Sequence, residues 1–544
     1  MRARCVWIVF GLSWLSFATV AVGDDLLPPD RPVEEVVDHY VESRLQHEQV
    51  TPALPADDAN FIRRATLDLA GRIPTTAEVQ AYLNATEPDK KSRLVDRLLA
   101  SPDFAYHQRN EFDTLLLGGN GSGEWRDWLL AAFQENRPWP QLFRELILAR
   151  EDDPAKKHAA AFLKARATSV DDLTNDTSKI FFGVSINCAK CHDHPLVADW
   201  LQDHYFGMAS FFNRTYLTKK NFLAERPEGG LKFRTKAGEE KQAHLMFLTG
   251  TVVAEPAVPE KTDEQKKADE AKQQADNDKE TPPDPPPFSR RSQLIDVALQ
   301  PDPNGFFTKA FVNRIWARLM GTGLVTPLDQ MHSENPPSHP ELLDWLARDT
   351  LAHNYDLRRI IRGVVLSRAY GRSSRWEGGT ERPVERLFAV AAVRPLTPMQ
   401  FSLSLSVATW NPLELAERQA KPEEWIARRR DLENHSRGFA PLIEIPGENF
   451  QISVSEALLF SNSQRIEQEY LRDSQDRLVA TLKGTSDRAQ GVQTAFFAVY
   501  SRPPLPEEIA AVTEYLGGRD DRAVAGWQQA LWSLVTGSEF RFNY

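Results

Sequence analysis

The feature that most restricts the fold of this chain is the stretch from residue 255 to residue 287, which has almost no large apolar side chain. It is rich in charged residues and glutamine, and it ends in a proline-rich run from Pro282 to Pro287. A segment of this composition cannot bury a core of its own. We therefore predict a disordered linker at 255–287 between two folded domains. A short solvated helix within the segment is the competing interpretation.

The sequence on both sides of this segment is typical of helices. A length of 544 residues supports at least two domains. Thr75 and Glu78 form a capping-box pattern, and Gly71 and Gly321 each follow an apolar stripe at helical spacing, where a left-handed residue can end a helix. Residues 231–235 and 244–253 favour β-strands and are expected to pair as a small sheet. The predicted fold is mainly α, with two helical domains, 33–254 and 288–544, of which the first has a small β insertion.

The first 23 residues are typical of an export signal. Arg2 and Arg4 precede an apolar run at 6–10, and the segment ends in the small residues Ala21-Val22-Gly23. We predict that residues 1–23 are removed and that the chain is exported to the periplasm or the cell surface. A retained anchor is the alternative, although the apolar run is shorter than the roughly 20 residues that span a bilayer. No later stretch is long enough for a membrane span in the mature chain.

The charge of the chain argues against two classes of partner. Its 65 Lys and Arg residues face 76 Asp and Glu residues, which gives a formal net charge of −11. Such a balance disfavours non-specific binding to nucleic acid or to anionic lipid. We therefore expect no nucleic-acid partner. No oligomeric state or catalytic activity follows from the sequence.

The cysteines carry the most specific chemical signal. Loss of the signal would remove Cys5 and leave Cys188 and Cys191, in the order Cys188-Ala189-Lys190-Cys191-His192. This is the pattern of covalent c-type haem attachment, in which the two thiols add to the vinyl groups of the porphyrin and the adjacent imidazole binds iron. Unprotected thiols also do not stay free in an oxidising compartment. We predict haem c at Cys188, Cys191 and His192, and electron transfer with a redox partner protein.

Two other interpretations use the same cysteines. Cys188, Cys191, His194 and His204 could close a tetrahedral zinc site. A Cys188–Cys191 disulfide, with the histidines held by ordinary hydrogen bonds, is the simplest alternative. With zinc or a disulfide the chain would be an exported scaffold or interaction protein. Met208, His194 and His204 are candidates for a second axial haem ligand, although Met208 is more typical of core packing.

Two sequence blocks resemble a known group of proteins. The block 188–212 contains CAKCHDHPL, and the block 310–370 contains AFVNRIWARLMGTGLV and NPPSHPELLDWLA. They resemble the planctomycete cytochrome-associated exported proteins. These join an N-terminal domain of unknown function, labelled cytochrome c-type for its CxxCH motif, to a C-terminal domain of unknown function. The resemblance implies haem attachment at Cys188 and Cys191 with His192 as axial ligand. In many relatives a separate small cytochrome domain precedes this unit; here the similar sequence begins soon after the signal, so we expect no such domain.

Overall fold

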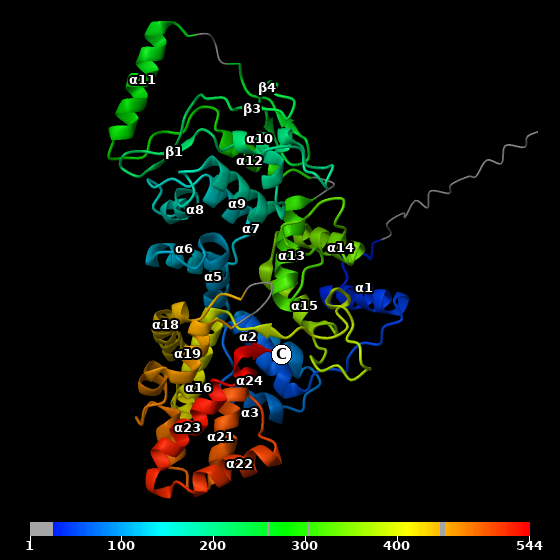
Figure 1. Cartoon of the computed structure of the whole chain (residues 1–544), viewed down its shortest axis with the longest axis vertical. Helices are drawn as coiled ribbons and strands as arrows, with labels where there is room; N and C mark the ends of the chain where they lie inside the picture. The colour runs from blue at the N-terminus through cyan, green and yellow to red at the C-terminus, as the bar shows by residue number, and fades with distance from the viewer. Residues whose placement is uncertain (1–25, 258–260, 302–304, 447–451) are drawn as a thin grey trace, which may run out of the picture.

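The computed structural model describes residues 26–257, 261–301, 305–446 and 452–544, and the predicted signal at 1–23 lies outside them. The described chain is mainly α-helical, as predicted, with small two-stranded antiparallel sheets (Figure 1). Within these residues no helix is long and apolar enough to cross a membrane.

The elements up to residue 253 are α1 (Val33–His47), α2 (Asp58–Ala70), α3 (Thr76–Asn84), α4 (Lys90–Ala100), α5 (Pro102–Leu117), α6 (Gly123–Gln134), α7 (Trp139–Ile147), η1 (Lys157–Ala160), α8 (Ala161–Lys164), α9 (Val170–Phe182), η2 (Asn187–Lys190), α10 (Gln202–Ser210), β1 (Thr215–Leu217), β2 (Leu223–Glu225), β3 (Lys232–Arg234), β4 (Glu240–Gln242), β5 (Leu245–Met246) and β6 (Val252–Val253).

The later elements are α11 (Asp263–Asp278), α12 (Arg290–Ala298), α13 (Phe306–Met320), α14 (Pro340–Ala352), α15 (Leu357–Leu366), η3 (Glu385–Leu387), β7 (Arg394–Pro395), α16 (Pro398–Thr409), α17 (Pro412–Gln419), α18 (Pro422–Phe439), η4 (Ala440–Leu442), α19 (Val454–Asn462), η5 (Ile466–Tyr470), α20 (Leu478–Lys483), α21 (Arg488–Tyr500), α22 (Pro506–Gly517), η6 (Asp520–Arg522), α23 (Ala523–Val535), α24 (Ser538–Arg541) and β8 (Phe542–Asn543).

Local signals in the sequence set several helix ends. Thr75 and Glu78 form the predicted capping box at the start of α3. Gly71 ends α2 with φ 69°, and Gly321 ends α13 with φ 88°, both in the left-handed conformation that a glycine adopts without steric cost. These predicted boundaries are confirmed. Each depends only on residues within one or two helical turns, so the local sequence was enough to predict it.

The predicted small sheet is wrong in its pairing. Residues 231–235 do not pair with 244–253; instead β3 pairs with β4, and β5 pairs with β6. Gly238 (φ 88°) and Gly250 (φ 79°) lie in the two tight turns, so each strand folds back on its nearest neighbour in the sequence. The insertion therefore consists of separate short hairpins.

The apolar side chains form two buried cores, and their division does not coincide with the segment 255–287. The larger core contains side chains from Val33 to Val390, on both sides of that segment. The smaller core contains side chains from Leu396 to Phe540, together with Leu67 and Ile73 from the N-terminal part. The polar composition of 255–287 indicates only that this segment lies outside a core. The helices before and after it both contribute side chains to the larger core.

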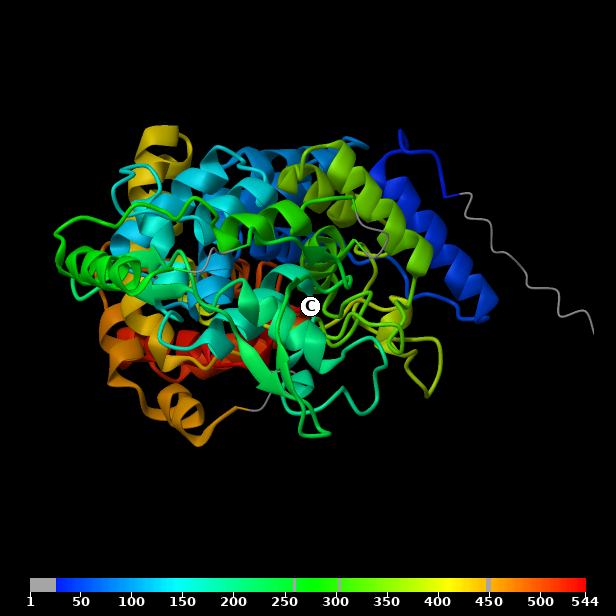
Figure 2. The same cartoon turned by 90° about the horizontal axis from the view of Figure 1, so that it is seen from above.

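The segment predicted as a disordered linker contains the helix α11, which has no buried residue. This matches the competing interpretation of a short solvated helix. α11 lies at the edge of the molecule in both views (Figures 1 and 2). Ion pairs join this part of the chain to the β1–β2 turn, with Lys219 2.8 Å from Asp278 and Lys220 2.5 Å from Glu280. The C-terminal end of α11 and the residues just after it are therefore held against the β1–β2 turn by ion pairs.

Helices from the two ends of the chain lie side by side. Figure 1 shows α3 among the C-terminal helices, where it packs against α17 and α21. The last strand β8 pairs with β7, and Arg64 of α2 donates a hydrogen bond to the Tyr544 carbonyl at 3.2 Å. This arrangement brings α3 and α4 face to face with α17 and α18, far away in sequence.

Candidate functional site: the cysteine turn

The CxxCH motif lies on a short turn that follows α9. The 3-10 turn η2 ends at Lys190, and Cys191 caps it. Ala189 points into the core and is fully buried, whereas Cys188, Cys191 and His192 are all exposed. The alternation of one buried residue with exposed neighbours presents the two thiols and the imidazole to solvent. Both cysteines are free thiols in the structure.

Charged contacts hold the turn to the helices beside it. Lys190 donates to the Asp171 carboxylate on α9 at 2.5 Å, and the Tyr205 hydroxyl of α10 donates to the same carboxylate at 2.5 Å. The bonds from Lys190 and Tyr205 lower the pKa of Asp171, while burial and Asp171 raise the pKa of Tyr205. Asp193 accepts from the backbone N–H of Gln202 at 2.9 Å. The turn is therefore fixed between the two cysteines, at Lys190, and just after them, at Asp193.

The His192 ring has one nitrogen engaged and one open. Its Nδ1 lies 2.7 Å from the backbone carbonyl oxygen of Asp193. A carbonyl only accepts, so Nδ1 carries the proton and the Nε2 lone pair is left for another ligand. Histidines that bind metals commonly donate their second ring N–H to a carbonyl in this way. The His192 ring is thus in a state suited to bind iron.

The structure does not bring the predicted zinc ligands together. The Nδ1 atom of His194 accepts from the backbone N–H of Val197 at 3.1 Å, and that of His204 accepts from Leu201 at 3.2 Å. Both histidines therefore brace the loop between the cysteines and α10. Within the described ranges, no group of three or more His, Cys, Asp or Glu side chains is placed to hold a metal ion. Met208, a candidate haem ligand, is fully buried in the core.

A loop from the second half of the chain contacts residues that precede and follow the cysteine turn. Ser185 donates to the Asp329 carbonyl at 2.7 Å, and Ser333 donates through both its N–H and its hydroxyl to Asp199 at 2.8 Å. Between the two loops lies a cavity of about 480 Å³, whose lining includes Trp200, His204 and His332.

His332 has an unpartnered, solvent-shielded Nδ1, and burial lowers the pKa of its ring. Nothing local in the sequence links His332 to the cysteines, so sequence reasoning missed it. In the sequence, His332 stands in the loop 328–335, after the helical apolar pattern that ends at Gly321. This loop position is the sequence feature that could have pointed to it.

Comparisons with known proteins match two parts of the chain. Residues 36–216, which contain the cysteine turn, match the family model PSCyt2, protein of unknown function (DUF1549). Residues 290–437 match the model PSD1, protein of unknown function (DUF1553). No curated protein and no solved structure matches the chain. The chain thus combines two family regions of unknown function, and the cavity lined by Trp200, His204 and His332 lies where the two regions meet.

Proposed function

We propose that the chain is an exported electron-transfer protein that carries haem c on Cys188 and Cys191, with His192 as the iron ligand. The observation that carries the proposal is the open Nε2 of His192 beside two exposed thiols on one braced turn. Attached there, haem would supply reversible one-electron transfer. The protein would hold the ring in place through the two thioether bonds and the oriented imidazole.

The exposure of the turn supports exchange of electrons with a partner protein. Cys188, Cys191 and His192 face solvent, and the neighbouring Leu196 is 81% exposed. An exposed apolar side chain next to a redox group is the kind of contact that a transient partner can cover. The partner would therefore dock on this face of the N-terminal family region.

A second candidate function is an exported scaffold in which the same cysteines hold zinc or form a disulfide. The contact of Asp199 with Ser333 favours it, because the cysteine loop then acts as a joint between the two family regions. In this case a zinc ion or disulfide at Cys188 and Cys191 would make the contact between the two family regions more rigid.

The absorbance and intact mass of the purified protein distinguish these functions. The full chain, exported with its own signal in cells that contain haem-attachment machinery, should be red and should keep its haem after denaturation, since thioether bonds survive unfolding. A double Cys188→Ala, Cys191→Ala variant should lose all retained haem. His192→Ala should keep covalent haem but change its spectrum. His47→Ala, which alters a histidine that is 78% exposed elsewhere, should leave the spectrum unchanged.

A colourless wild-type protein contradicts the haem proposal. If its mass equals the mature chain less two hydrogens, the cysteines form a disulfide. If it carries one zinc ion per chain, the metal alternative is supported, with His194 and His204 as the next residues to substitute.

A further inference from the structure

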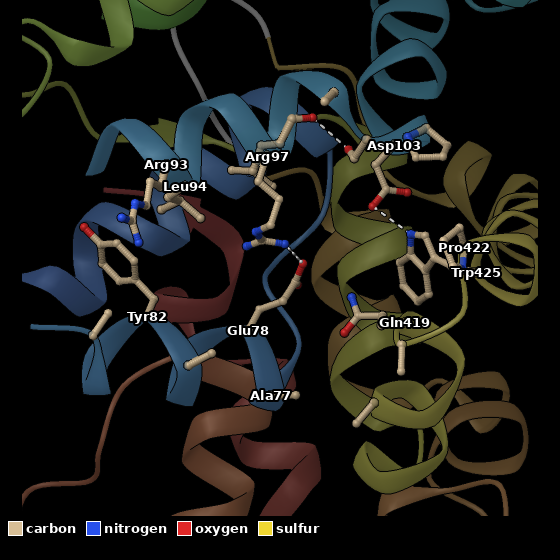
Figure 3. Close-up of a pocket in the computed structure, with 18 of the residues that line it drawn as sticks. Ala77, Glu78, Tyr82, Arg93, Leu94, Arg97, Asp103, Gln419, Pro422 and Trp425 are labelled. Carbon is tan, nitrogen blue, oxygen red and sulfur yellow. Dashed lines mark hydrogen bonds and ion pairs between the residues drawn. The ribbon is translucent and has the colours of Figure 1, made fainter. Parts of the chain in front are cut away.

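A large groove lies far from the cysteine turn, between α3 and α4 on one side and α17 and the start of α18 on the other (Figure 3). We call it the α3–α18 groove. Its volume is about 790 Å³, within the range of roughly 300–1,000 Å³ that small-molecule sites occupy. The groove joins the two family regions, since α3 and α4 belong to the first and α17 and α18 to the second.

The walls of the α3–α18 groove are mostly apolar. Ala77 and Ala81 face it from α3, and Ala416 faces it from α17. Their short side chains leave space that larger residues would fill. Tyr82 and Trp425 line the same space, and each is only 6% exposed. An aromatic or aliphatic group placed here would lose contact with water on several sides.

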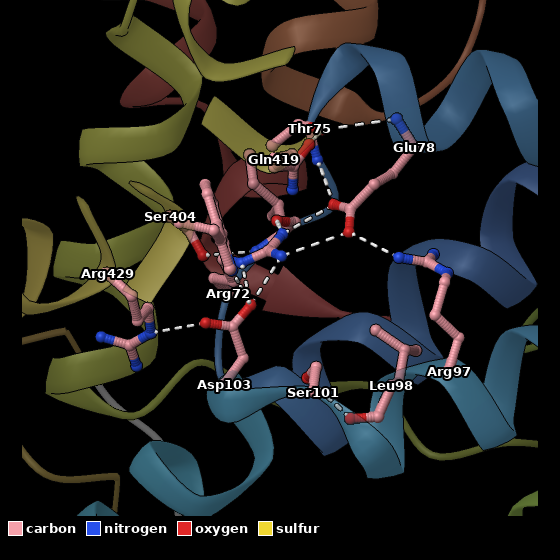
Figure 4. A network of polar contacts seen from close by, with 12 residues as sticks. Arg72, Thr75, Glu78, Arg97, Leu98, Ser101, Asp103, Ser404, Gln419 and Arg429 are labelled. Atoms are coloured by element: carbon pink, nitrogen blue, oxygen red, sulfur yellow. Dashed lines mark hydrogen bonds and ion pairs between the residues drawn. The ribbon is translucent and has the colours of Figure 1, made fainter. Parts of the chain in front are cut away.

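The floor of the groove is a buried ionic network (Figure 4). The Arg72 guanidinium lies 2.8 Å from Glu78 and 2.7 Å from Asp103, and Arg429 lies 3.0 Å from Asp103. Burial alone would raise the pKa of Glu78, but Arg72 and Arg97 hold it below its ordinary value. Glu78 therefore stays ionised and bound to arginine. It is not poised to exchange protons with a bound molecule.

The network carries more positive than negative charge. It continues through Arg429 to Glu433, and it contains five arginines and four carboxylates, namely Arg72, Arg97, Arg109, Arg126 and Arg429 with Glu78, Asp103, Asp113 and Glu433. Charges in a low-dielectric setting are costly unless they are balanced. The four buried arginines match the four buried carboxylates, so the fifth arginine, Arg97, is the one whose charge an anion bound at the groove would pair.

Arg97 is the member of the network that a bound anion can reach. Its side chain is 51% exposed, whereas those of the other four arginines are almost completely buried. Figure 3 shows Arg97 reaching from α4 toward Glu78, between Tyr82 on one side and Gln419 and Trp425 on the other. It donates to Glu78 through Nη1 at 3.0 Å. A guanidinium offers five donors, so an anion can bind beside that contact.

We propose that the α3–α18 groove binds a small amphipathic anion. Its apolar body packs against the alanine faces, Tyr82 and Trp425, and its carboxylate, sulfonate or phosphate group binds Arg97. The cavity, its apolar walls and the half-exposed Arg97, which shares Glu78 with Arg72, support this assignment.

Two dyes that differ by one charged group test this proposal on the full mature protein. Anilinonaphthalene sulfonate has an aromatic body and a sulfonate, and N-phenyl-1-naphthylamine has the same body without it. The wild-type protein should bind one anionic dye per chain, with a cooperative unfolding transition that excludes a partly unfolded state. Arg97→Gln should weaken the anionic dye about tenfold, since hydrogen bonds to charged groups contribute about 1.5–3 kcal/mol. It should leave the neutral dye unchanged.

Three further variants complete the test. Arg430→Gln removes the same charge from an exposed position of α18 outside the groove, and it should bind both dyes as the wild type does. Ala81→Trp fills the groove and should abolish the binding of both dyes. Ala427→Trp adds the same side chain at an exposed position outside it and should have no effect. Equal anion affinity in Arg97→Gln and wild type, or undiminished binding in Ala81→Trp, overturns the proposal. So does a wild-type protein that binds no dye.

Discussion

The cysteine turn and the α3–α18 groove are built in opposite ways. The turn places its chemistry on five consecutive residues, 188–192, of which Cys188, Cys191 and His192 are exposed. The groove depends on a bond such as that between Thr75 and Gln419, which are 344 positions apart, and the charges of its floor, apart from Arg97, are buried. The two thiols and the imidazole of the turn therefore stay close together even if the packing around the turn changes. The groove exists only in the folded chain.

This difference predicts how each region responds to substitution. Exposed groups exchange protein contacts for water at little cost, whereas a buried charge without its partner keeps the full desolvation penalty. Substitutions in the groove floor should therefore change stability far more than substitutions in the turn.

The largest effect is expected at the centre of the groove floor. Arg72→Met leaves Glu78 and Asp103 without their shared buried partner, and it should lower the free energy of unfolding by about 3–5 kcal/mol, measured by urea denaturation. Arg93→Met is the matched control, because Arg93 is 64% exposed and pairs with Asp89 at the surface. It should cost no more than about 1 kcal/mol. An equal loss of stability in the two variants would contradict the expected difference between the buried Arg72 and the exposed Arg93.

A pH effect should appear at Glu78. The folded protein holds its pKa below the ordinary value of 4.5, so the stabilisation is fully present above about pH 5 and is lost as the pH falls toward the folded pKa. The stability advantage of wild type over Glu78→Gln should therefore shrink by about 1–2 kcal/mol between pH 5 and pH 3. Urea denaturation of both proteins at each pH measures it. A difference that does not vary with pH would show that Glu78 is not held ionised by its arginines.

A smaller effect is expected where the turn is braced. Lys190→Met breaks the pair with Asp171, in which both side chains are more than 40% exposed. Surface ion pairs contribute about 0.2–1 kcal/mol, and the loss should lie in that range and decrease with added salt. Thermal unfolding at low and high ionic strength checks this. A loss above 2 kcal/mol would mean that the turn depends on buried charge, as the groove floor does.

The smallest effect is expected at the cysteines themselves. In protein made without haem-attachment machinery and kept reduced, Cys188→Ser with Cys191→Ser should change the free energy of unfolding by less than about 0.5 kcal/mol, because both thiols are exposed. Alkylation of the folded wild type without residues 1–23, and so without Cys5, should add two labels per chain, as counted by mass. A large destabilisation, or thiols that react only in denaturant, would place the cysteines inside the fold.

Local patterns predicted much of the secondary structure. The capping box of Thr75 and Glu78 and the helix ends at Gly71 and Gly321 were correct because their partners lie within a few residues. The pairing of the strand segments was wrong because alternation predicts a strand but does not name its partner. The division of the cores was missed for a related reason. A polar segment shows where the chain leaves a core, and the core to which it returns is set by packing.

The sequence by itself determined that Cys188, Cys191 and His192 lie close together, since they fall within five consecutive positions wherever the chain places them. It also determined the helical class through apolar periodicity. Only the tertiary structure decided that Arg72 and Arg429 share Asp103, that α3 faces α17 across a groove, and that His332 and His204 line one cavity. The physical reason is distance along the chain. Contacts between residues hundreds of positions apart depend on how all the intervening helices pack together.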